Sequence, residues 1–173
     1  ARLMYGLIPR HAGELGWEGF DRTFFEVKDA SGAQREPVSG AVNAISCFGD
    51  NAAARDDPSL VPVDEEGRRA TAERPYFDWS FVCPSHEAYR RGLLALIERC
   101  VEASPDVRLD DVGFPRAEYC HCDRCLAAFS ESGFDDWATW RADVIGDFVE
   151  AAAERVPGDL SLAVHPDPYP GHL

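Results

Sequence analysis

Three cysteines crowd into six positions of the sequence, where Cys120, Cys122 and Cys125 form the pattern Cys-x-Cys-x-x-Cys. Thiolates two or three residues apart can bind one metal ion from a tight loop, and zinc is the metal that an all-thiolate tetrahedral site favours. The alternatives are a set of free thiols or a disulfide. In a reducing compartment, this crowding favours metal binding over a disulfide framework.

A tetrahedral site needs a fourth ligand from outside this loop, and Cys83 is the favoured candidate. It lies just before a predicted helix, and parallel β/α units place such loops on the same side of the sheet as the cluster. His86, His121 and Cys47 remain alternatives. Cys100 falls on the apolar face of the predicted helix and is expected to be a core residue. Four thiolates close the coordination shell, so the predicted zinc has a structural role.

Two adjacent carboxylates, Asp110 and Asp111, stand at the end of a predicted strand. Catalytic groups of parallel barrels project from the carboxyl ends of the strands, and a carboxylate pair is the chemistry of glycoside hydrolysis. Neighbouring strand residues face opposite sides, so we expect one of the two aspartates to point into a site. Asp167 follows the next predicted strand and is a candidate substrate-binding residue of the same pocket. The alternative is that these aspartates cap turns and helices.

Aromatic side chains flank the same loops and could stack on sugar rings. Among these aromatic residues, Trp79 and Phe114 are the candidates for substrate binding. Arg116 is a further candidate substrate-binding residue. The alternative is that these aromatic side chains pack in the core or within the loops. Trp137 and Trp140 lie three positions apart on a predicted helix and are expected to be core residues.

The elements that must position these residues alternate between strand and helix in the second half of the chain. Residues 50–75 predict a long loop, and residues 76–82 predict either a strand or an extended loop. Alternation of strand and helix builds a parallel sheet through crossover helices, so the predicted fold is α/β, a partial or truncated (β/α) TIM barrel. The predicted strands span residues 3–9, 41–48, 107–112 and 160–164, and the predicted helices span residues 18–27, 85–104, 126–130 and 135–156.

The net charge of the chain limits the classes of partner that it is expected to bind. Of its 173 residues, 31 are acidic and 17 are basic, which gives a net charge of −14. Phosphate binding needs a basic face, so this balance argues against nucleic acid and against an anionic membrane surface. No apolar run reaches the about 18 residues of a membrane span and no signal peptide is visible, so a cytoplasmic protein is expected. Lys28 is the only lysine, and acid excess with so little lysine resembles proteins of salt-loving archaea; a GC-rich genome is the alternative explanation.

The segment from Cys83 to Phe129 resembles the zinc-bearing region of glycoside hydrolase family 42 β-galactosidases and of related barrel hydrolases. In that family, a cysteine after an earlier strand joins a Cys-x-Cys-x-x-Cys loop after the fourth strand, and the four cysteines bind zinc. The resemblance therefore implies that Cys83 and the three clustered cysteines are zinc ligands. It also implies a carbohydrate as the substrate.

The acid/base residue of that family is the glutamate of an Asn-Glu pair at the end of the fourth strand, and Asp110-Asp111 occupies that place here. The resemblance implies Asp111 as the general acid/base with Asp110 beside it, although both residues differ from the family pair. In some related hydrolases the first aspartate of such a pair is the active one, so Asp110 stays an alternative.

Length bears on how much of a barrel the chain holds. A complete barrel takes about 250 residues, and the nucleophile of the family, a glutamate on the seventh strand, has no counterpart before Leu173. We therefore expect one barrel domain over residues 1–173 that is a fragment of a longer barrel. The expected function is carbohydrate hydrolysis by carboxylates beside a structural zinc site. The alternative is a non-catalytic, zinc-stabilised domain that binds sugar or a protein partner, and a homo-oligomer is compatible with either.

Overall fold

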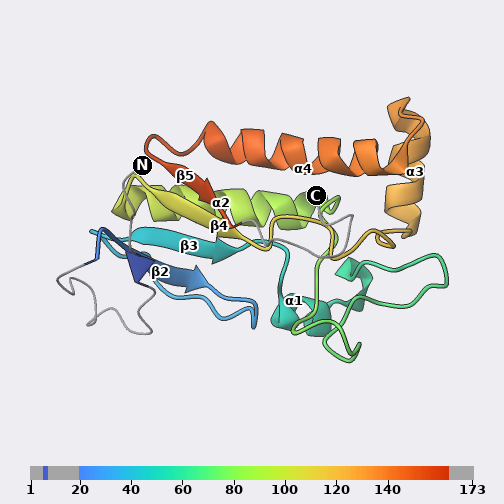
Figure 1. Ribbon diagram of the computed structural model, residues 1–173, viewed down its shortest axis with the longest axis horizontal. Helices are drawn as coiled ribbons and strands as arrows, with labels where there is room; N and C mark the ends of the chain where they lie inside the picture. Colours follow the sequence, from blue (N-terminus) through green and yellow to red (C-terminus); the bar gives the residue numbers. More distant parts are fainter. Residues whose placement is uncertain (1–5, 8–19, 164–173) are drawn as a thin grey trace.

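A parallel sheet with helices on one face forms the protein (Figure 1), and the computed structural model describes residues 6–7 and 20–163. Five strands pair in chain order, and every pair is parallel, so all carboxyl ends meet at one edge of the sheet. This arrangement is a partial (β/α) barrel, which confirms the predicted fold class. The strands are β1 (Gly6–Leu7), β2 (Arg22–Lys28), β3 (Val42–Ser46), β4 (Val107–Asp110) and β5 (Leu160–Leu162).

The main core lies between the sheet and two long helices, α2 (Glu87–Ala103) and α4 (Trp137–Ala153), which run side by side in Figure 1. Ile45 of β3 and Leu109 of β4 are fully buried in this core. Ile97 of α2 and Phe148 of α4 pack against them from the helical side. Burying each such side chain stabilises the fold by about 1.5–3 kcal/mol, so this layer fixes the edge from which the functional loops emerge.

Shorter helices lie beyond the carboxyl ends of the strands, namely α1 (Asn51–Asp56), the one-turn helix η2 (Pro58–Leu60) and α3 (Asp123–Ser132). Asp50 caps α1 by accepting from the backbone N–H of Ala53, and Asp57 caps η2 through Ser59. These caps correct the expectation of a long loop over residues 50–75, because an aspartate at the N-cap satisfies the free N–H groups of a short helix.

The predicted helix over residues 18–27 is wrong, because the chain forms strand β2 there. Phe25 and Val27 are buried while Glu26 between them is exposed, which is the period-two pattern of a strand. Phe24 adds a further aromatic residue that favours strands over helices.

The other predicted elements differ from the observed ones mainly at their ends. Helix α2 begins at Glu87, with His86 rather than Ser85 as its N-cap. Residues 76–82 form turns and bends rather than a strand, with one isolated bridge between Gly49 and Phe81. Of the strand predicted over residues 3–9, the structure describes β1. Among the described residues, no helix is long and apolar enough to cross a membrane. The predictions for residues 41–48, 107–112, 160–164, 126–130 and 135–156 correspond to β3, β4, β5, α3 and α4.

Candidate metal centre and carboxylate pocket

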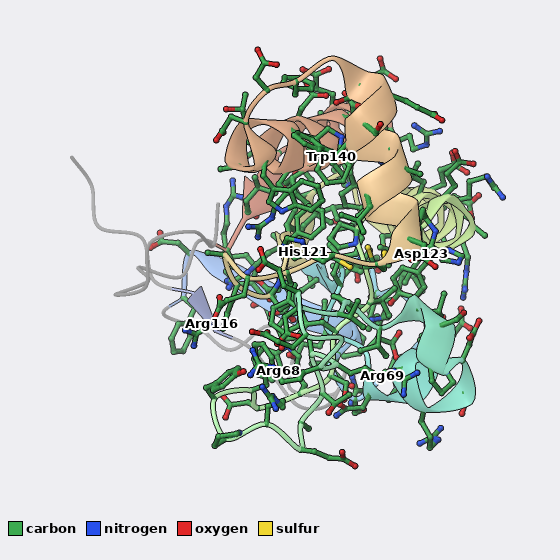
Figure 2. The ribbon with its side chains drawn as sticks, turned by 90° about the vertical axis from the view of Figure 1, so that its right-hand side faces the viewer. Arg68, Arg69, Arg116, His121, Asp123 and Trp140 are labelled. Carbon is green, nitrogen blue, oxygen red and sulfur yellow. The ribbon has the colours of Figure 1, made fainter. Side chains whose placement is uncertain are left out.

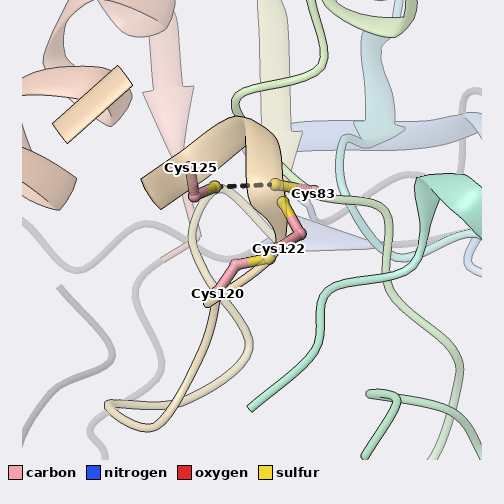
Figure 3. Close-up of side chains that lie close together, drawn as sticks. All are labelled: Cys83, Cys120, Cys122 and Cys125. Atoms are coloured by element: carbon pink, nitrogen blue, oxygen red, sulfur yellow. Dashed lines mark hydrogen bonds between the residues drawn. The ribbon is translucent and has the colours of Figure 1, made fainter. Parts of the chain in front are cut away.

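Four cysteines from two separate segments, the loop that holds Cys83 and the loop and first turn of α3, meet beyond the carboxyl ends of β3 and β4 (Figure 3). The Sγ atoms of Cys83, Cys120, Cys122 and Cys125 all lie within 4.8 Å of one another. The Sγ atoms of Cys83 and Cys125 are 3.4 Å apart, which is hydrogen-bond distance, and all four cysteines are free thiols. The described cluster contains no histidine, so neither His86 nor His121 competes with Cys83 for the fourth place.

A bridging loop between the two cysteine-bearing segments holds them together. The carbonyl oxygen of Leu60 accepts from the backbone N–H of Cys83 at 2.8 Å. The carbonyl oxygen of Val63 accepts from the backbone N–H of His121 at 2.7 Å. The same stretch therefore fixes both the segment before α2 and the segment before α3, and it brings their thiols together.

The donor set and its surroundings fit a thiophilic metal ion such as zinc. Cys83, Cys120 and Cys125 are buried, and Ser85 Oγ lies 3.1 Å from Cys83 Sγ and 3.0 Å from Cys125 Sγ. Contacts with the other three thiols lower the pKa of Cys122. Four cysteines within reach of one point are the ligands of a closed, structural zinc site.

Aromatic side chains pack against the cysteines and form the aromatic cluster, which comprises buried Phe114, Tyr119 and Trp140 and partly buried Phe77, Phe129 and Trp137. Figure 2 labels Trp140 of this cluster and the neighbouring His121. His121 stacks on Trp137, with ring centroids 5.0 Å apart. Arg141 is 4% exposed and donates to the carbonyl oxygen of Arg116 at 2.7 Å. Burial lowers the pKa of Arg141, whereas the nearby thiols raise it. A buried cation close to the cysteines would offset part of the negative charge that their thiolates carry around a metal ion.

The second candidate site begins with an unusual backbone conformation at Asp111. Its φ angle is 53°, and it is the only described residue other than glycine with a positive φ. The carbonyl oxygens of Asp110 and Asp111 accept from the backbone N–H groups of Cys47 and Phe48 at 2.7 and 3.1 Å. The left-handed turn breaks the strand alternation, so both carboxylates line one pocket and the expectation that only one would do so is wrong.

The pocket has a volume of about 200 Å³ and opens at the carboxyl ends of β2, β3 and β4. Asp110 Oδ1 accepts from Arg108 Nε at 2.9 Å, which fixes the direction of that carboxylate. Asp111 Oδ2 lies 2.5 Å from Ser46 Oγ. Acids, bases and one aromatic side chain line the pocket: Glu26, Lys28, Ser46, Trp79, Arg108, Asp110 and Asp111.

Gly49 allows three polar atoms to converge beside the pocket. A Cβ atom at this position would lie 2.7 Å from Trp79 Nε1 and 2.8 Å from Asp111 Oδ2, closer than real contacts allow. It would also lie 2.9 Å from Ser46 Oγ. Trp79 Nε1 is buried and has no hydrogen-bond partner among the described residues. Only glycine permits this packing, so the pocket wall depends on the absence of a Cβ atom at position 49.

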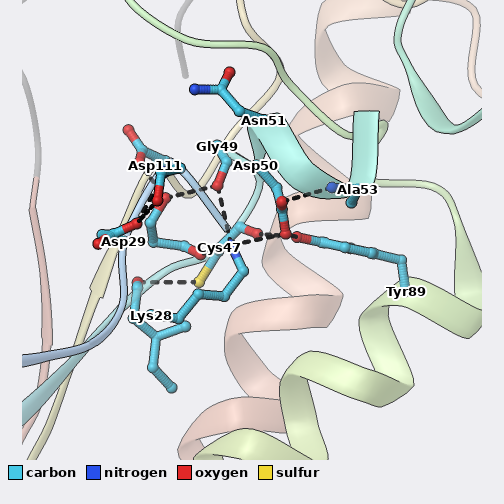
Figure 4. Close-up of polar contacts among 12 residues, drawn as sticks. Lys28, Asp29, Cys47, Gly49, Asp50, Asn51, Ala53, Tyr89 and Asp111 are labelled. Carbon is cyan, nitrogen blue, oxygen red and sulfur yellow. Dashed lines mark hydrogen bonds and ion pairs between the residues drawn. The ribbon is translucent and has the colours of Figure 1, made fainter. Parts of the chain in front are cut away.

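A buried ammonium supports the pocket from below (Figure 4). Lys28 is 3% exposed, and its Nζ donates to the carbonyl oxygens of Ser46 at 2.7 Å and Gly49 at 3.0 Å. Nζ also lies 3.2 Å from Asp50 Oδ2, which accepts from the Tyr89 hydroxyl at 2.8 Å. Burial and the neighbouring Asp50 carboxylate raise the pKa of Tyr89. Sequence reasoning missed Lys28 as a pocket residue, although a lone lysine at the end of a strand was a usable signal.

The sequence-predicted substrate-binding residues do not all reach the pocket. Trp79 lines it together with both aspartates. Phe114 is 4% exposed in the aromatic cluster, 4.7 Å below the guanidinium carbon of Arg141, so it is a core residue. Arg116 lies over the Tyr76 ring and pairs with Glu118, outside the pocket lining. Asp167 falls outside the described residues. Trp140 is a core residue as predicted, and Trp137 packs partly buried against the same cluster.

Comparisons with known proteins place the fold. No protein-family model and no curated protein sequence matches the chain. A hypothetical protein from Ruminiclostridium thermocellum ATCC 27405 superposes with a TM-score of 0.60 at 16% identity, covering 83% of this chain and 83% of that chain. Alpha-L-fucosidase isoenzyme 2 from Paenibacillus thiaminolyticus gives 0.59 at 16% identity over 84% of this chain and 27% of the enzyme.

An alpha-galactosidase from Thermus thermophilus, solved with p-nitrophenyl alpha-D-galactopyranoside, gives a TM-score of 0.54 at 13% identity. The match covers 94% of this chain and 38% of that enzyme. The chain therefore spans less than half the length of either glycosidase. At such identities the likeness shows a shared fold alone, and function has to be argued from the site.

Proposed function

We propose that this chain is a carbohydrate-active domain of the glycoside hydrolase type. The observation that carries the proposal is the convergence of Asp110, Asp111 and Trp79 on one pocket at the carboxyl ends of parallel strands. That edge is where barrel enzymes hold their reactive groups. Carboxylates can protonate a glycosidic oxygen and activate water, and an indole ring offers a flat face to a sugar.

The two carboxylates take different roles in this proposal. Asp111 acts as the general acid/base and exchanges a proton with the glycosidic oxygen or with water. Asp110, fixed by Arg108, is the carboxylate that stabilises positive charge developing on the sugar ring. The expectation that the chain is part of a longer barrel remains a proposal, and so does the contribution of a further carboxylate from elsewhere in that barrel.

We further propose that Cys83, Cys120, Cys122 and Cys125 bind a structural zinc ion. The thiols lie within reach of one point, are mostly buried, and leave no position open for a substrate. Zinc there would brace the segment that carries Trp79, because Cys83 follows it in the same loop. The metal would supply stability to the loops around the pocket rather than chemistry within it.

A non-catalytic sugar-binding domain is the second candidate function. The length of the hypothetical protein from Ruminiclostridium thermocellum favours it, because this chain covers 83% of that whole solved chain. A domain of this size could therefore fold alone and bind a sugar or a protein partner. The proposed partner is a carbohydrate, and neither nucleic acid nor an anionic membrane is proposed as one. A cytoplasmic location and a homo-oligomeric state are also proposals.

Hydrolysis of a panel of 4-nitrophenyl glycosides distinguishes the two candidates. The longer barrel proposed above is expected to release nitrophenol from at least one sugar, and its Asp111→Asn variant to lose that activity by about a hundredfold or more. Asp143→Asn, at an exposed position on α4, is the matched control and should keep full activity. Sugar binding that quenches tryptophan emission without any hydrolysis would favour the non-catalytic domain instead.

A further inference from the structure

The hydroxyl of Ser46 has two hydrogen-bond acceptors within reach but only one proton to donate. Its Oγ lies 2.5 Å from Asp111 Oδ2 and 2.9 Å from the carbonyl oxygen of Gly49. Ser46 is 6% exposed, so water does not readily replace either contact. The direction of this one proton therefore depends on whether Asp111 carries a proton of its own.

Both protonation states of Asp111 fit the same arrangement of heavy atoms. When Asp111 is ionised, the Ser46 O–H donates to Oδ2. When a proton sits on Oδ2, the carboxyl O–H donates to Ser46 Oγ, and the serine proton turns to the carbonyl oxygen of Gly49. Each state keeps Ser46 and the carboxyl group hydrogen-bonded, and the change needs only rotation of one hydroxyl.

The surrounding contacts hold the heavy atoms still while that proton rotates. The carbonyl oxygen of Asp111 accepts from the Phe48 N–H at 3.1 Å. Lys28 Nζ donates to the carbonyl oxygens of Ser46 at 2.7 Å and Gly49 at 3.0 Å. The Gly49 oxygen thus keeps a donor from Lys28 even when the serine proton points away from it, and no buried acceptor is left unpaired.

The partner of Asp110 behaves differently. Arg108 Nε donates to Asp110 Oδ1 at 2.9 Å, and a guanidinium has no acceptor to offer a protonated carboxyl. Arg108 can therefore only donate to Asp110, whereas Ser46 can either donate to Asp111 or accept from it. Among the described residues, the charged groups that line the pocket with Asp111 are Glu26 and Lys28 from β2 and Arg108 and Asp110 from β4, and Asp50 pairs with Lys28. The buried Cys47 thiol also interacts electrostatically with Asp111.

We infer that Ser46 is a positioning residue that lets Asp111 gain and lose a proton in place, which makes Asp111 rather than Asp110 the acid/base. This inference rests on the proposed function. In the acid step, the O–H bond of Asp111 breaks as the glycosidic oxygen takes its proton, and the bond from the anomeric carbon to that oxygen breaks with both electrons going to the departing hydroxyl. In the base step, Asp111 takes a proton from water, the water O–H bond breaks, and the water oxygen forms the new bond to the anomeric carbon, so that one water is consumed for each glycosidic bond cleaved.

Carbon-13 NMR of the carboxyl groups tests the role of Ser46 without a substrate. The full chain, Ser46→Ala and Ser46→Thr are titrated, and proton–nitrogen spectra confirm that each variant is folded. Ionised Asp111 loses a stronger hydrogen bond than protonated Asp111 does, so its titration midpoint should rise in Ser46→Ala by about 0.5–1 pH unit. The Asp110 resonance should titrate alike in both proteins, and Ser46→Thr should titrate like the wild type.

An Asp111 midpoint that is unchanged in Ser46→Ala would overturn the inference, and so would an equal displacement of the Asp110 titration. Glycoside hydrolysis is measured in parallel, and Ser46→Ala should lower kcat by about tenfold with little change in KM. If no glycoside is hydrolysed by the wild type, the proposed function fails, while the titration still decides the role of Ser46.

Discussion

The backbone N–H of His121 donates to the carbonyl oxygen of Val63 at 2.7 Å, and this bond joins the loop after β4 to the loop after η2. His121 lies between two of the clustered cysteines. The position of the cluster therefore depends on a segment that lies about 60 residues earlier in the chain. Asp64 follows Val63 directly and organises that segment. Disturbing Asp64 should therefore reach the cysteines.

Asp64→Asn is expected to destabilise the fold and loosen the metal site. The Asp64 carboxylate accepts from the Arg68 N–H at 2.7 Å, from the Glu66 N–H at 3.1 Å and from Arg68 Nε at 2.6 Å. Losing the charge should cost about 1–3 kcal/mol in the free energy of unfolding. Urea unfolding of the variant measures this cost, and Asp78→Asn, at an exposed position, should cost less than about 0.5 kcal/mol.

The pH dependence of stability should show the same carboxylate. Burial raises the pKa of Asp64, but hydrogen bonds from Arg68 and Glu66 outweigh it and hold the pKa below its ordinary value. The stabilisation is therefore complete above the unfolded-state pKa and disappears as the pH falls through the folded-state pKa. As the pH is lowered from about 5 to about 2, thermal unfolding should show a smaller loss of stability in Asp64→Asn than in the wild type.

Cys83→Ala should remove bound zinc, whereas Cys100→Ala should leave it in place. Both residues are buried, but only Cys83 belongs to the cluster, while Cys100 packs in the main core. Mass spectrometry should find one zinc ion per wild-type chain and almost none in Cys83→Ala. Loss of the metal should lower the thermal midpoint by about 10 °C or more. Equal zinc content in the two variants would contradict the site.

Gly49→Ala should damage the pocket, because its new methyl group would meet Trp79 Nε1 and Asp111 Oδ2 at less than 3.0 Å. The expected cost is about 1–3 kcal/mol in stability, with loss of any glycosidase activity. Gly92→Ala on α2 is the control, because no atom lies within 4 Å of its added Cβ. That change should stabilise the fold by about 0.5–1 kcal/mol. Similar unfolding curves for the two variants would argue against the close packing at Gly49.

Lys28→Met should be among the most destabilising single changes in the chain. Its ammonium lies 3.2 Å from the Asp50 carboxylate, and the two side chains are 2% and 7% exposed. Removing one partner of a buried pair leaves an uncompensated charge, at a cost of about 3–5 kcal/mol. Arg91→Met breaks the exposed pair with Glu87 and should cost less than about 0.5 kcal/mol. Calorimetry of both variants checks the contrast.

Salt should stabilise the protein if its acidic surface suits a salt-rich cell. A net charge of −14 creates repulsion within the folded chain, and molar salt reduces the screening length to about 3 Å. The midpoint temperature of thermal unfolding is therefore expected to rise steadily as potassium chloride increases from about 0.1 M to about 3 M. A flat or falling curve would favour a GC-rich genome as the reason for the scarcity of lysine.

The sequence predicted the features that depend on periodicity and topology. Helix α2 and strand β4 follow from their hydrophobic patterns, and parallel connections correctly brought Cys83 to the other cysteines. Strand β2 was missed because Arg22–Lys28 is short and flanked by charged residues. The left-handed conformation of Asp111 depends on backbone contacts from a neighbouring strand, and no local pattern predicts it.

Burial of the single lysine has a practical consequence for following the protein in solution. Lys28 supplies the only side-chain amine of the chain and is 3% exposed at the base of the pocket. Amine-reactive reagents should modify it only when the strand edge opens, and a lysine-specific protease should leave the folded chain uncut at this position. The rate of acylation at Lys28 therefore reports how often the structure opens locally beneath the carboxylates.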